Sequence, residues 1–264
     1  MGNFSLRKPF MPVGLEIGTN TFRAVQIKST PTLPIIMAYG STKVPHGAVE
    51  EGEIVDIETV ANVLSRLWKQ AGFVGKKVIL GVANQKVVAR LIELPYMEKS
   101  ELKGAIQFQA QEYIPIPVEE AIIDFQVVGE FINESEERMM EVLIVAGQKD
   151  MINSNVAALE KAYLRPEVID VSSFAIVNSL LGTSPAIFEE GAESVALINI
   201  ASGTTNIVVA EKGVPRFTRV TSLAGNDFTQ AISDMLGVPF DEAEELKIKV
   251  GLPFLKEKEK KEET

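Results

Sequence analysis

The sequence predicts a mixed α/β fold built as two lobes, of which the second is incomplete. Three observations lead to this expectation. Two strand–turn–strand segments of the same layout begin at Val13 and at Val195. Between them, segments that alternate apolar and polar residues, as strands do, are interleaved with segments of helical period. After the second hairpin only one further strand and two helices are expected, which is little sheet for a complete lobe.

The first hairpin extends from Val13 to Lys28 and has the features of a phosphate cradle. Apolar residues alternate with glycine or glutamate before the turn, which is the period of a strand. In the turn at residues 18–21, glycine permits unusual dihedral angles, and the Thr and Asn side chains can bond to nearby backbone. The N–H groups and hydroxyls of such a turn can face an anion, while Glu16 can hold the water shell of a cation. On this pattern alone, an ordinary β-hairpin is the alternative.

The second hairpin, residues 195–213, repeats this layout, and residues 15–19 align with residues 198–202. Two such hairpins that face each other across a cleft can clamp the phosphates of one nucleotide. For the metal we name Glu16, acting through water, with Asn199 assisting. For the Thr and Ser residues, plain turn chemistry is the alternative. The nucleotide-contacting candidates are Gly18, Thr19, Asn20, Thr21, Arg23, Ser202, Gly203, Thr204, Thr205 and Gly225, the last at the start of a helix.

The composition limits the class of protein. With 264 residues, of which 46% are hydrophobic, the chain is long enough for one large core or two smaller ones. A net charge of −10 and a pI near 4.9 argue against bulk binding of nucleic acid, which requires a basic face. The absence of cysteine excludes disulfides, thiolate zinc sites and cysteine catalysis, and it suits a reducing cytoplasm. No apolar run approaches the length of a membrane helix, and residues 1–12 lack a signal-peptide core, so a short flexible arm is expected there.

The residues after the first hairpin continue the first lobe. An edge-like strand precedes a helix over 58–71, whose apolar residues recur with helical spacing and which Gly72 ends. Residues 77–83 and 86–94 are expected to form two further strands of the same mixed sheet, joined by a turn that contains Asn84.

The Leu–Pro step at 94–95 breaks this sheet and opens a different module. Ser100 is expected to cap a helix over 101–113, and two prolines soon afterwards prevent that helix from continuing. Strands are expected over 121–130 and 140–146. The second of these is apolar on both faces, so it is expected to lie at the centre of its sheet.

The remaining helices are predicted over 150–162, 172–181, 227–236 and 241–250, and the remaining strands over 165–171 and 216–223. A linker over 183–191 marks the boundary between the lobes, and the charge run at the end is a solvated tail. The expected division of the chain is a flexible arm at 1–12, a first-lobe core at 13–94 and 150–184, an inserted subdomain at 95–149, a partial second lobe at 185–254 and a charged tail at 255–264.

The two hairpins resemble the phosphate motifs of the actin, Hsp70 and sugar-kinase superfamily. The inserted module narrows the resemblance to PilM, a family of actin-like proteins of type IV pilus assembly. Its Leu94-Pro95 step, its Glu101-Leu102 helix start and its Tyr113-Ile-Pro-Ile-Pro117 stretch are similar to that family's pattern. The resemblance covers nearly the whole chain. It implies an actin-like, RNase H-type α/β fold of two lobes, with an inserted FtsA/PilM-type subdomain and an incomplete second lobe.

Three departures from the family pattern matter. The family usually carries Asp before each phosphate turn, whereas this sequence has Glu16 and Asn199, and the neutral amide contributes no charge for Mg²⁺. Ala201 replaces a glycine that allows close approach of the backbone, and Arg23 stands where Lys is common. The family's further subdomain and its Gly-rich adenosine-binding turn do not follow the last predicted helix, so the resemblance implies a C-terminally truncated chain.

The resemblance implies a cytoplasmic adaptor at the inner face of the bacterial cytoplasmic membrane, within the type IV pilus assembly platform. It would bind ATP and Mg²⁺ and be at most a weak ATPase, because Asn199 removes a charge that phosphoryl transfer uses. Its implied partners are the cytoplasmic tail of a PilN-like membrane protein, other platform and motor proteins, and copies of itself in rings or filaments. Membrane contact would be through the partner, and no nucleic acid is implied. Three alternatives stay open: an FtsA-like filament protein of cell division, a true ATPase or small-molecule kinase of the same superfamily, and an adaptor of a type II secretion platform.

The resemblance also implies a peptide site between the two modules of the first lobe, where the partner's tail would add as an extended segment. For any single residue there, burial in the core is the alternative. Asp170 is the one further acid near the expected cleft; it is expected to be a helix N-cap, with a catalytic role as the alternative. The peptide-site candidates are Leu94, Pro95, Met97, Phe108, Tyr113, Ile114 and Ile116.

Overall fold

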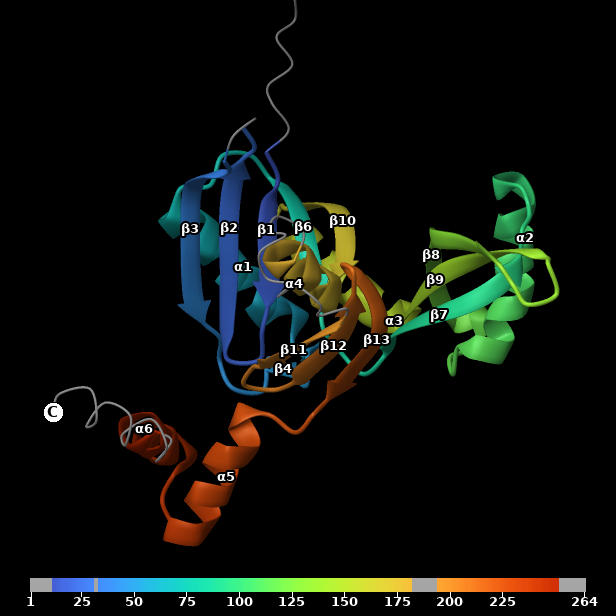
Figure 1. Cartoon of the computed structure of the whole chain (residues 1–264). Helices are drawn as coiled ribbons and strands as arrows, with labels where there is room; N and C mark the ends of the chain where they lie inside the picture. Colours follow the sequence, from blue (N-terminus) through green and yellow to red (C-terminus); the bar gives the residue numbers. More distant parts are fainter. Residues whose placement is uncertain (1–10, 31–32, 182–193, 252–264) are drawn as a thin grey trace, which may run out of the picture.

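The computed structural model describes residues 11–30, 33–181 and 194–251. Within these ranges the chain forms a five-stranded sheet, two three-stranded sheets and a small two-stranded ribbon (Figure 1). Most of the predicted arm at 1–12, the linker at 183–191 and the tail at 255–264 lie outside the described residues.

The five-stranded sheet carries the first hairpin near its centre, in the strand order β10-β6-β1-β2-β3. β1 and β2 pair antiparallel, which places Glu16 opposite Arg23, while β6 pairs in parallel with both β1 and β10. This arrangement confirms the predicted first hairpin within a mixed sheet. The strands are β1 (Val13–Ile17), β2 (Thr21–Lys28), β3 (Ile35–Lys43), β6 (Lys77–Val82) and β10 (Arg165–Val171), and the ribbon is β4 (Val49–Glu50) with β5 (Glu53–Ile54).

Two helices, α1 (Ile57–Ala71) and α3 (Lys149–Lys161), pack against each other and contribute to the core beside this sheet. α1 begins after Asp56, whose carboxylate accepts the backbone N–H of Thr59 at 3.0 Å. It ends at Gly72, which has a φ of 70°, the left-handed conformation that glycine adopts without strain. The predicted helix and its glycine stop are confirmed.

The inserted unit is a three-stranded antiparallel sheet, β7-β9-β8, packed against α2 (Figure 1). β9 lies at the centre, as its apolar faces predicted. The prediction that residues 86–94 continue the first sheet is wrong, because β7 pairs with β9 from Val87 to Pro95. The elements are β7 (Val87–Pro95), α2 (Lys99–Tyr113), the short 3-10 helix η1 (Val118–Glu120), β8 (Ala121–Ile132) and β9 (Arg138–Gln148).

Alternation of residues identifies a strand but not the sheet that it joins, because pairing depends on contacts far apart in the sequence. Ile92 and Leu94 of β7 pack with Leu102 and Ile106 of α2, in a core separate from that of the first lobe. These contacts favour an inserted unit that begins near residue 86. The division of the chain into subdomains stays a prediction.

The start of α2 also differs from the prediction. The helix begins at Lys99, after Glu98, and no side chain caps it. The expected cap at Ser100 is therefore wrong, and this serine lies in the first turn of the helix. The carbonyl of Glu98 accepts the N–H groups of Glu101 and Leu102, so the backbone closes the first turn without a serine cap.

The second hairpin forms its own antiparallel sheet, β11-β12-β13, and α4 packs against β12 with Val177 and Val208 in a small core. α5 and α6 pack on each other and lie apart from the sheets (Figure 1). α5 buries Thr229 and α6 buries Ala243, and both helices leave large apolar side chains exposed. Few side chains of these two helices are therefore buried, and the expected incomplete second lobe stays a prediction. The elements are α4 (Ser172–Leu180), β11 (Ser194–Ile200), β12 (Thr205–Glu211), β13 (Val214–Thr221), α5 (Gly225–Leu236) and α6 (Phe240–Val250).

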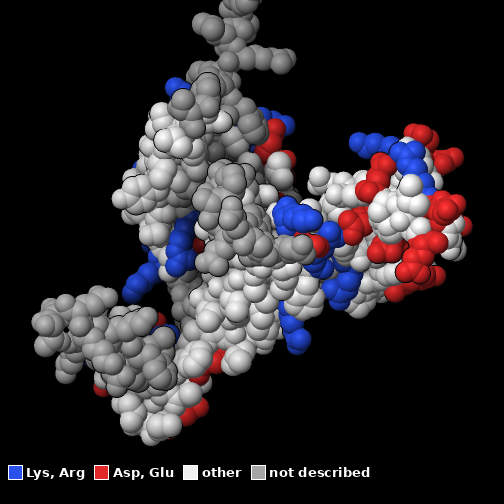
Figure 2. Space-filling model, viewed as in Figure 1, with Lys and Arg blue, Asp and Glu red and all other residues white. Residues whose placement is uncertain are grey.

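Charge is unevenly distributed over the surface. Figure 2 shows acidic side chains gathered on the inserted unit. Residues 95–149 contain eleven Asp or Glu against four Lys or Arg, so this unit carries most of the net negative charge of the chain. Within the described ranges, each helix is too short or too polar to cross a membrane.

Candidate nucleotide cleft

The turns of the two hairpins meet. A Cβ atom on Gly203 would lie 2.0 Å from the hydroxyl oxygen of Thr19, so the turns can approach this closely because residue 203 has no side chain. Beside this contact, the amide of Asn20 donates to the Oδ1 atom of Asn226 at 2.9 Å. The first turn is thereby joined to the second turn and to the start of α5. Both predicted phosphate motifs consequently border one cleft.

The cleft has a volume of about 1430 Å³, and both hairpins, β6, β10, α4, α5 and α6 contribute to its lining. It adjoins a small cavity of about 30 Å³ between the two turns. Eight of the predicted ligand-site residues line the cleft: Glu16, Gly18, Asn20, Thr21, Arg23, Asn199, Ser202 and Gly225. The small cavity is lined by three more, Thr19, Gly203 and Thr204, together with Glu16, Gly18 and Asn199.

Two of the predicted nucleotide contacts are used by the fold itself. Thr205 lines neither space, and its hydroxyl donates to the carbonyl of Leu223 at 2.7 Å. Gly225 borders the cleft, but its N–H donates to the carbonyl of Ala201 at 2.9 Å. The start of α5 is therefore closed by the second turn, which the sequence did not indicate. Contact between these two residues and a nucleotide stays a prediction.

Glu16 and Arg23 form an ion pair across β1 and β2, with 3.1 Å between Oε2 and Nη1. Their side chains are 42% and 60% exposed, so water screens the pair. Either side chain can therefore change to another partner at little cost in free energy. The predicted metal carboxylate and the predicted phosphate cation therefore neutralise each other. A phosphate group that attracted Arg23 would release Glu16 for a cation.

Among the described residues, no group of three or more His, Asp or Glu side chains is placed to hold a metal ion directly. Glu16 and Asn199 line both the cleft and the small cavity, where a carboxylate and an amide oxygen suit a hydrated cation. Asn206, which the sequence analysis missed, lies opposite Asn199 in the strand pair and also lines the cavity. It is 3% exposed, and its Oδ1 atom has no hydrogen-bond partner. Since a buried unpaired acceptor requires a donor, a single ordered water, such as one from the shell of a cation, suits this cavity.

The sequence analysis also missed Lys247 of α6, which borders the cleft. Its ammonium donates to the Thr229 hydroxyl at 2.7 Å and lies 2.6 Å from the Glu244 carboxylate. Burial alone would raise the pKa of Glu244, but the hydrogen bonds from Lys247 and Thr229 hold it below its usual range. The i, i+3 spacing of Glu244 and Lys247 places both on one side of the helix, and this spacing was the available signal.

Asp170 lies near the end of β10 and borders the cleft. Burial raises the pKa of its carboxyl, and a 2.8 Å hydrogen bond from the backbone N–H of Val171 partly opposes this rise. The expected role of Asp170 as a helix cap is wrong, because Val171 occupies the N-cap position of α4 and no side chain caps that helix. A partly buried carboxyl with a raised pKa beside a cleft is suited to proton transfer, so the catalytic prediction for Asp170 stays open.

A family model for the type IV pilus assembly protein PilM matches residues 14–259. The chain belongs to the PilM family. Among solved structures, this PilM-family chain is similar to the PilM-PilN type IV pilus biogenesis complex, with a TM-score of 0.80 and 28% identity over 91% of this chain and 70% of that one. It is also similar to the ethanolamine utilization protein EutJ from Carboxydothermus hydrogenoformans, with a TM-score of 0.53 and 16% identity over 91% of this chain and 62% of that one. The second likeness supports the fold alone. Together they confirm the predicted actin-like fold class.

Cell division proteins FtsA are also related to this PilM-family chain. The FtsA of Bacillus subtilis is 25% identical over 93% of this chain and 59% of its own length. The FtsA of Escherichia coli K12 is 24% identical over 90% of this chain and 60% of its own length. The chain therefore spans about three fifths of the length of these relatives.

The predicted peptide-site residues of this PilM-family chain do not form one continuous surface. Four belong to the core of the inserted unit or pack against it: Leu94, Met97, Ile114 and Ile116. Pro95 is exposed at the end of β7, and Phe108 and Tyr113 are 79% and 39% exposed on α2. Of the seven candidates, these last three are the exposed ones, and contact of any of the seven with a peptide stays a prediction.

Proposed function

We propose that this chain is a nucleotide-binding adaptor of the type IV pilus assembly platform, at the cytoplasmic face of the inner membrane. The observation that carries the proposal is the meeting of two phosphate-type turns, at Thr19 and Gly203, in a chain of the PilM family. Turns that face one cleft from two sides suit a ligand with several phosphate groups. Membrane contact would come through a PilN-like partner.

Mg-ATP is the proposed ligand of the cleft. Bound Mg²⁺ would neutralise phosphate charge, and the oxygens of Glu16, Asn199 and Asn206 would hold its water shell. The N–H groups and hydroxyls of the turn at residues 18–21 would face the phosphates, and Arg23 would exchange Glu16 for a phosphate oxygen. Turnover is expected to be slow, because the second hairpin contributes two neutral amides where phosphoryl transfer benefits from charge.

The proposed protein partner is the cytoplasmic tail of a PilN-like membrane protein. The likeness to a PilM-PilN complex, at 28% identity and a TM-score of 0.80, supports this partner. The acidic inserted unit favours a tail that carries basic residues, with Phe108 and Tyr113 as exposed aromatic contacts. Contacts with other platform and motor proteins, and rings or filaments of the chain itself, belong to the same proposal and rest on family membership.

The test is a paired calorimetric titration with Mg-ATP and with a synthetic PilN-tail peptide. We expect Glu16→Gln to weaken Mg-dependent ATP binding roughly tenfold, because it removes the carboxylate at the cation site. Asn199→Asp is the matched variant, and it should restore or strengthen that binding by adding a charge. Peptide affinity should survive in both variants. Rapid ATP turnover with no peptide affinity would overturn the adaptor function.

A second candidate function is a filament protein of the cell-division type, favoured by the FtsA relatives that match 90% or more of this chain. It predicts polymers on addition of Mg-ATP, visible by negative-stain electron microscopy, without affinity for the PilN tail. Peptide binding by a chain that stays monomeric would exclude it.

A further inference from the structure

The turn between β4 and β5 contacts two places at once. One is the cavity between the phosphate turns, and the other is the connection at residues 83–86 between the first lobe and the inserted unit, which we call the hinge. Gly52, in this turn, lines the small cavity together with Glu16 and Gly18. Ala83, which follows β6, lines the same cavity. The chain continues from Ala83 through Asn84 into the inserted unit. One short turn therefore lies beside both the proposed cation site and the first connection to that unit.

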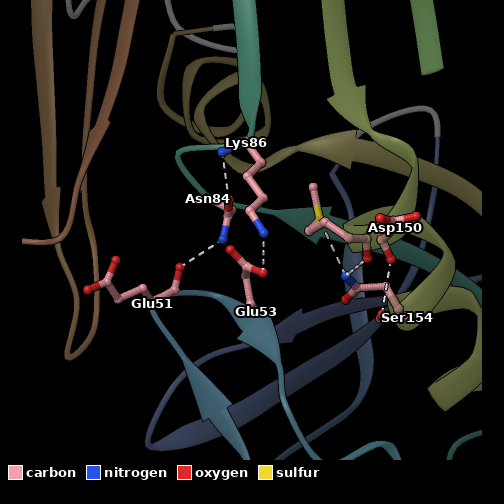
Figure 3. A network of polar contacts seen from close by, with 8 residues as sticks. Glu51, Glu53, Asn84, Lys86, Asp150 and Ser154 are labelled. Carbon is pink, nitrogen blue, oxygen red and sulfur yellow. Dashed lines mark hydrogen bonds and ion pairs between the residues drawn. The ribbon is translucent and has the colours of Figure 1, made fainter. Parts of the chain in front are cut away.

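Asn84 fastens this turn to the hinge (Figure 3). Its side-chain amide donates to the carbonyl of Glu51 at 3.0 Å, and its Oδ1 atom accepts the N–H of Lys86 at 2.6 Å. Asn84 is 2% exposed, so these bonds are made away from water and their loss would leave buried groups unpaired. The ammonium of Lys86 adds an ion pair with Glu53, with 2.6 Å between nitrogen and oxygen.

The two connections between the first lobe and the inserted unit lie side by side. The carbonyl of Lys86 accepts the N–H of Gln148 at 3.1 Å, and Val87 pairs with Gly147. α3 begins directly after the second connection and contacts β5. A displacement of the β4–β5 turn would therefore reach both connections.

Gly52 of the turn packs closely against the backbone of Ala83. A Cβ atom on Gly52, which has a φ of 80°, would lie 2.3 Å from the carbonyl oxygen of Ala83. Glu51 also has a positive φ, of 47°, a conformation that non-glycine residues seldom adopt. Backbone groups in direct contact pass on a displacement, because the turn cannot move toward the hinge without pushing it.

We propose that the β4–β5 turn transmits a displacement at the cavity between the phosphate turns to the orientation of the inserted unit. Asn84 acts as the positioning residue that holds the turn on the hinge. This coupling goes beyond the proposed binding of nucleotide and peptide, since it is a property of contacts within the chain.

The lack of cysteine in the chain allows a direct test with spin labels. Labels at Lys69→Cys on α1 and Glu112→Cys on α2, both exposed positions, report the distance between the first lobe and the inserted unit by electron double resonance. We expect Gly52→Ala, which inserts a methyl group between turn and hinge, to displace the maximum of the distance distribution. We expect Asn84→Ala to broaden it.

Asn133→Ala is the matched control, because Asn133 bonds the N–H groups of Ser135 and Glu137 in a turn remote from the hinge. It should leave the distribution unchanged. If Asn84→Ala prevents folding, Lys86→Met removes only the ion pair and should broaden the distribution less. A distribution that is unchanged in Gly52→Ala, in a chain that still unfolds cooperatively, overturns the coupling. Since no nucleotide is added, this result is independent of whether the cleft binds one.

Discussion

The side-chain contacts of Lys247 stabilise the fold and also form part of the border of the candidate cleft. Its ammonium is bonded to Glu244 and Thr229 on the border of the cleft. Lys247→Met is expected to lower the free energy of unfolding by about 1–2 kcal/mol near pH 7, because it leaves the carboxylate without its cation. The pKa of Glu244 is lower in the folded chain than in the unfolded one. The ionised carboxylate therefore adds stability above the unfolded pKa, and this stability is lost as the pH falls through the folded pKa.

The difference between wild type and Lys247→Met should accordingly shrink between pH 7 and pH 4. Urea unfolding followed by circular dichroism at both pH values measures it. Glu244→Gln is the control, since it removes the titrating group and should show little of this pH dependence. An equal loss of stability at both pH values would refute the expectation.

The sequence revealed most of the cleft residues through their place in or beside a recognisable turn. Glu16 and Arg23 were predicted because they flank a recognisable turn, and they lie at the cleft as expected. Asn206 follows the second turn, and its approach to the cavity depends on the register that pairs it with Asn199. Lys247 reaches the cleft through the packing of α6 on α5, which no local pattern specifies. Residues that tertiary contacts bring to a site are therefore the ones that were missed.

At the scale of elements, the meeting of the two hairpins depends on one glycine. Gly203→Ala would place a methyl group against Thr19, and overpacking of this kind costs about 1–3 kcal/mol. We expect a lower melting temperature and weaker Mg-ATP binding, because the turns must separate. Gly104→Ala in α2 is the matched control: no atom lies within 4 Å of its added Cβ, and alanine favours a helix. Differential scanning fluorimetry with and without Mg-ATP measures both. Unchanged melting and binding in Gly203→Ala would show that the turns do not hold each other.

The elements themselves were largely predictable, whereas their partners were not. α1 has apolar residues at helical spacing and a glycine stop, and these local signals suffice to predict it. The assignment of β7 to the first sheet was wrong, because alternation in Val87–Pro95 fits either sheet. Ile92 and Leu94 of β7 pack in one core with α2, the next helix along the chain. This contact favours the sheet of the inserted unit over the first sheet.

At the scale of the whole molecule, Arg216 ties the second lobe to the inserted unit. Its guanidinium, on β13, lies 2.5 Å from Glu141 of β9 and 2.7 Å from Glu211 of β12. Burial alone would lower the pKa of Arg216, but the two carboxylates raise it, so the cation persists wherever the chain is folded. Arg216 and Glu141 are 75 positions apart, and no sequence pattern linked them. With the Asn84 hinge, this ion pair gives the inserted unit a second attachment.

A double-mutant cycle tests whether that attachment holds the molecule together. The side chains of Arg216 and Glu141 are 30% and 23% exposed, so we expect a coupling energy of about 1 kcal/mol between Arg216→Met and Glu141→Gln. Amide hydrogen exchange in β9 should accelerate in either single variant. Glu211→Gln is the matched control, because the bond from Glu211 stays within the second lobe and its loss should leave β9 protected. If the two substitutions prove additive and β9 exchanges as in the wild type, the Arg216–Glu141 pair does not hold the inserted unit in place.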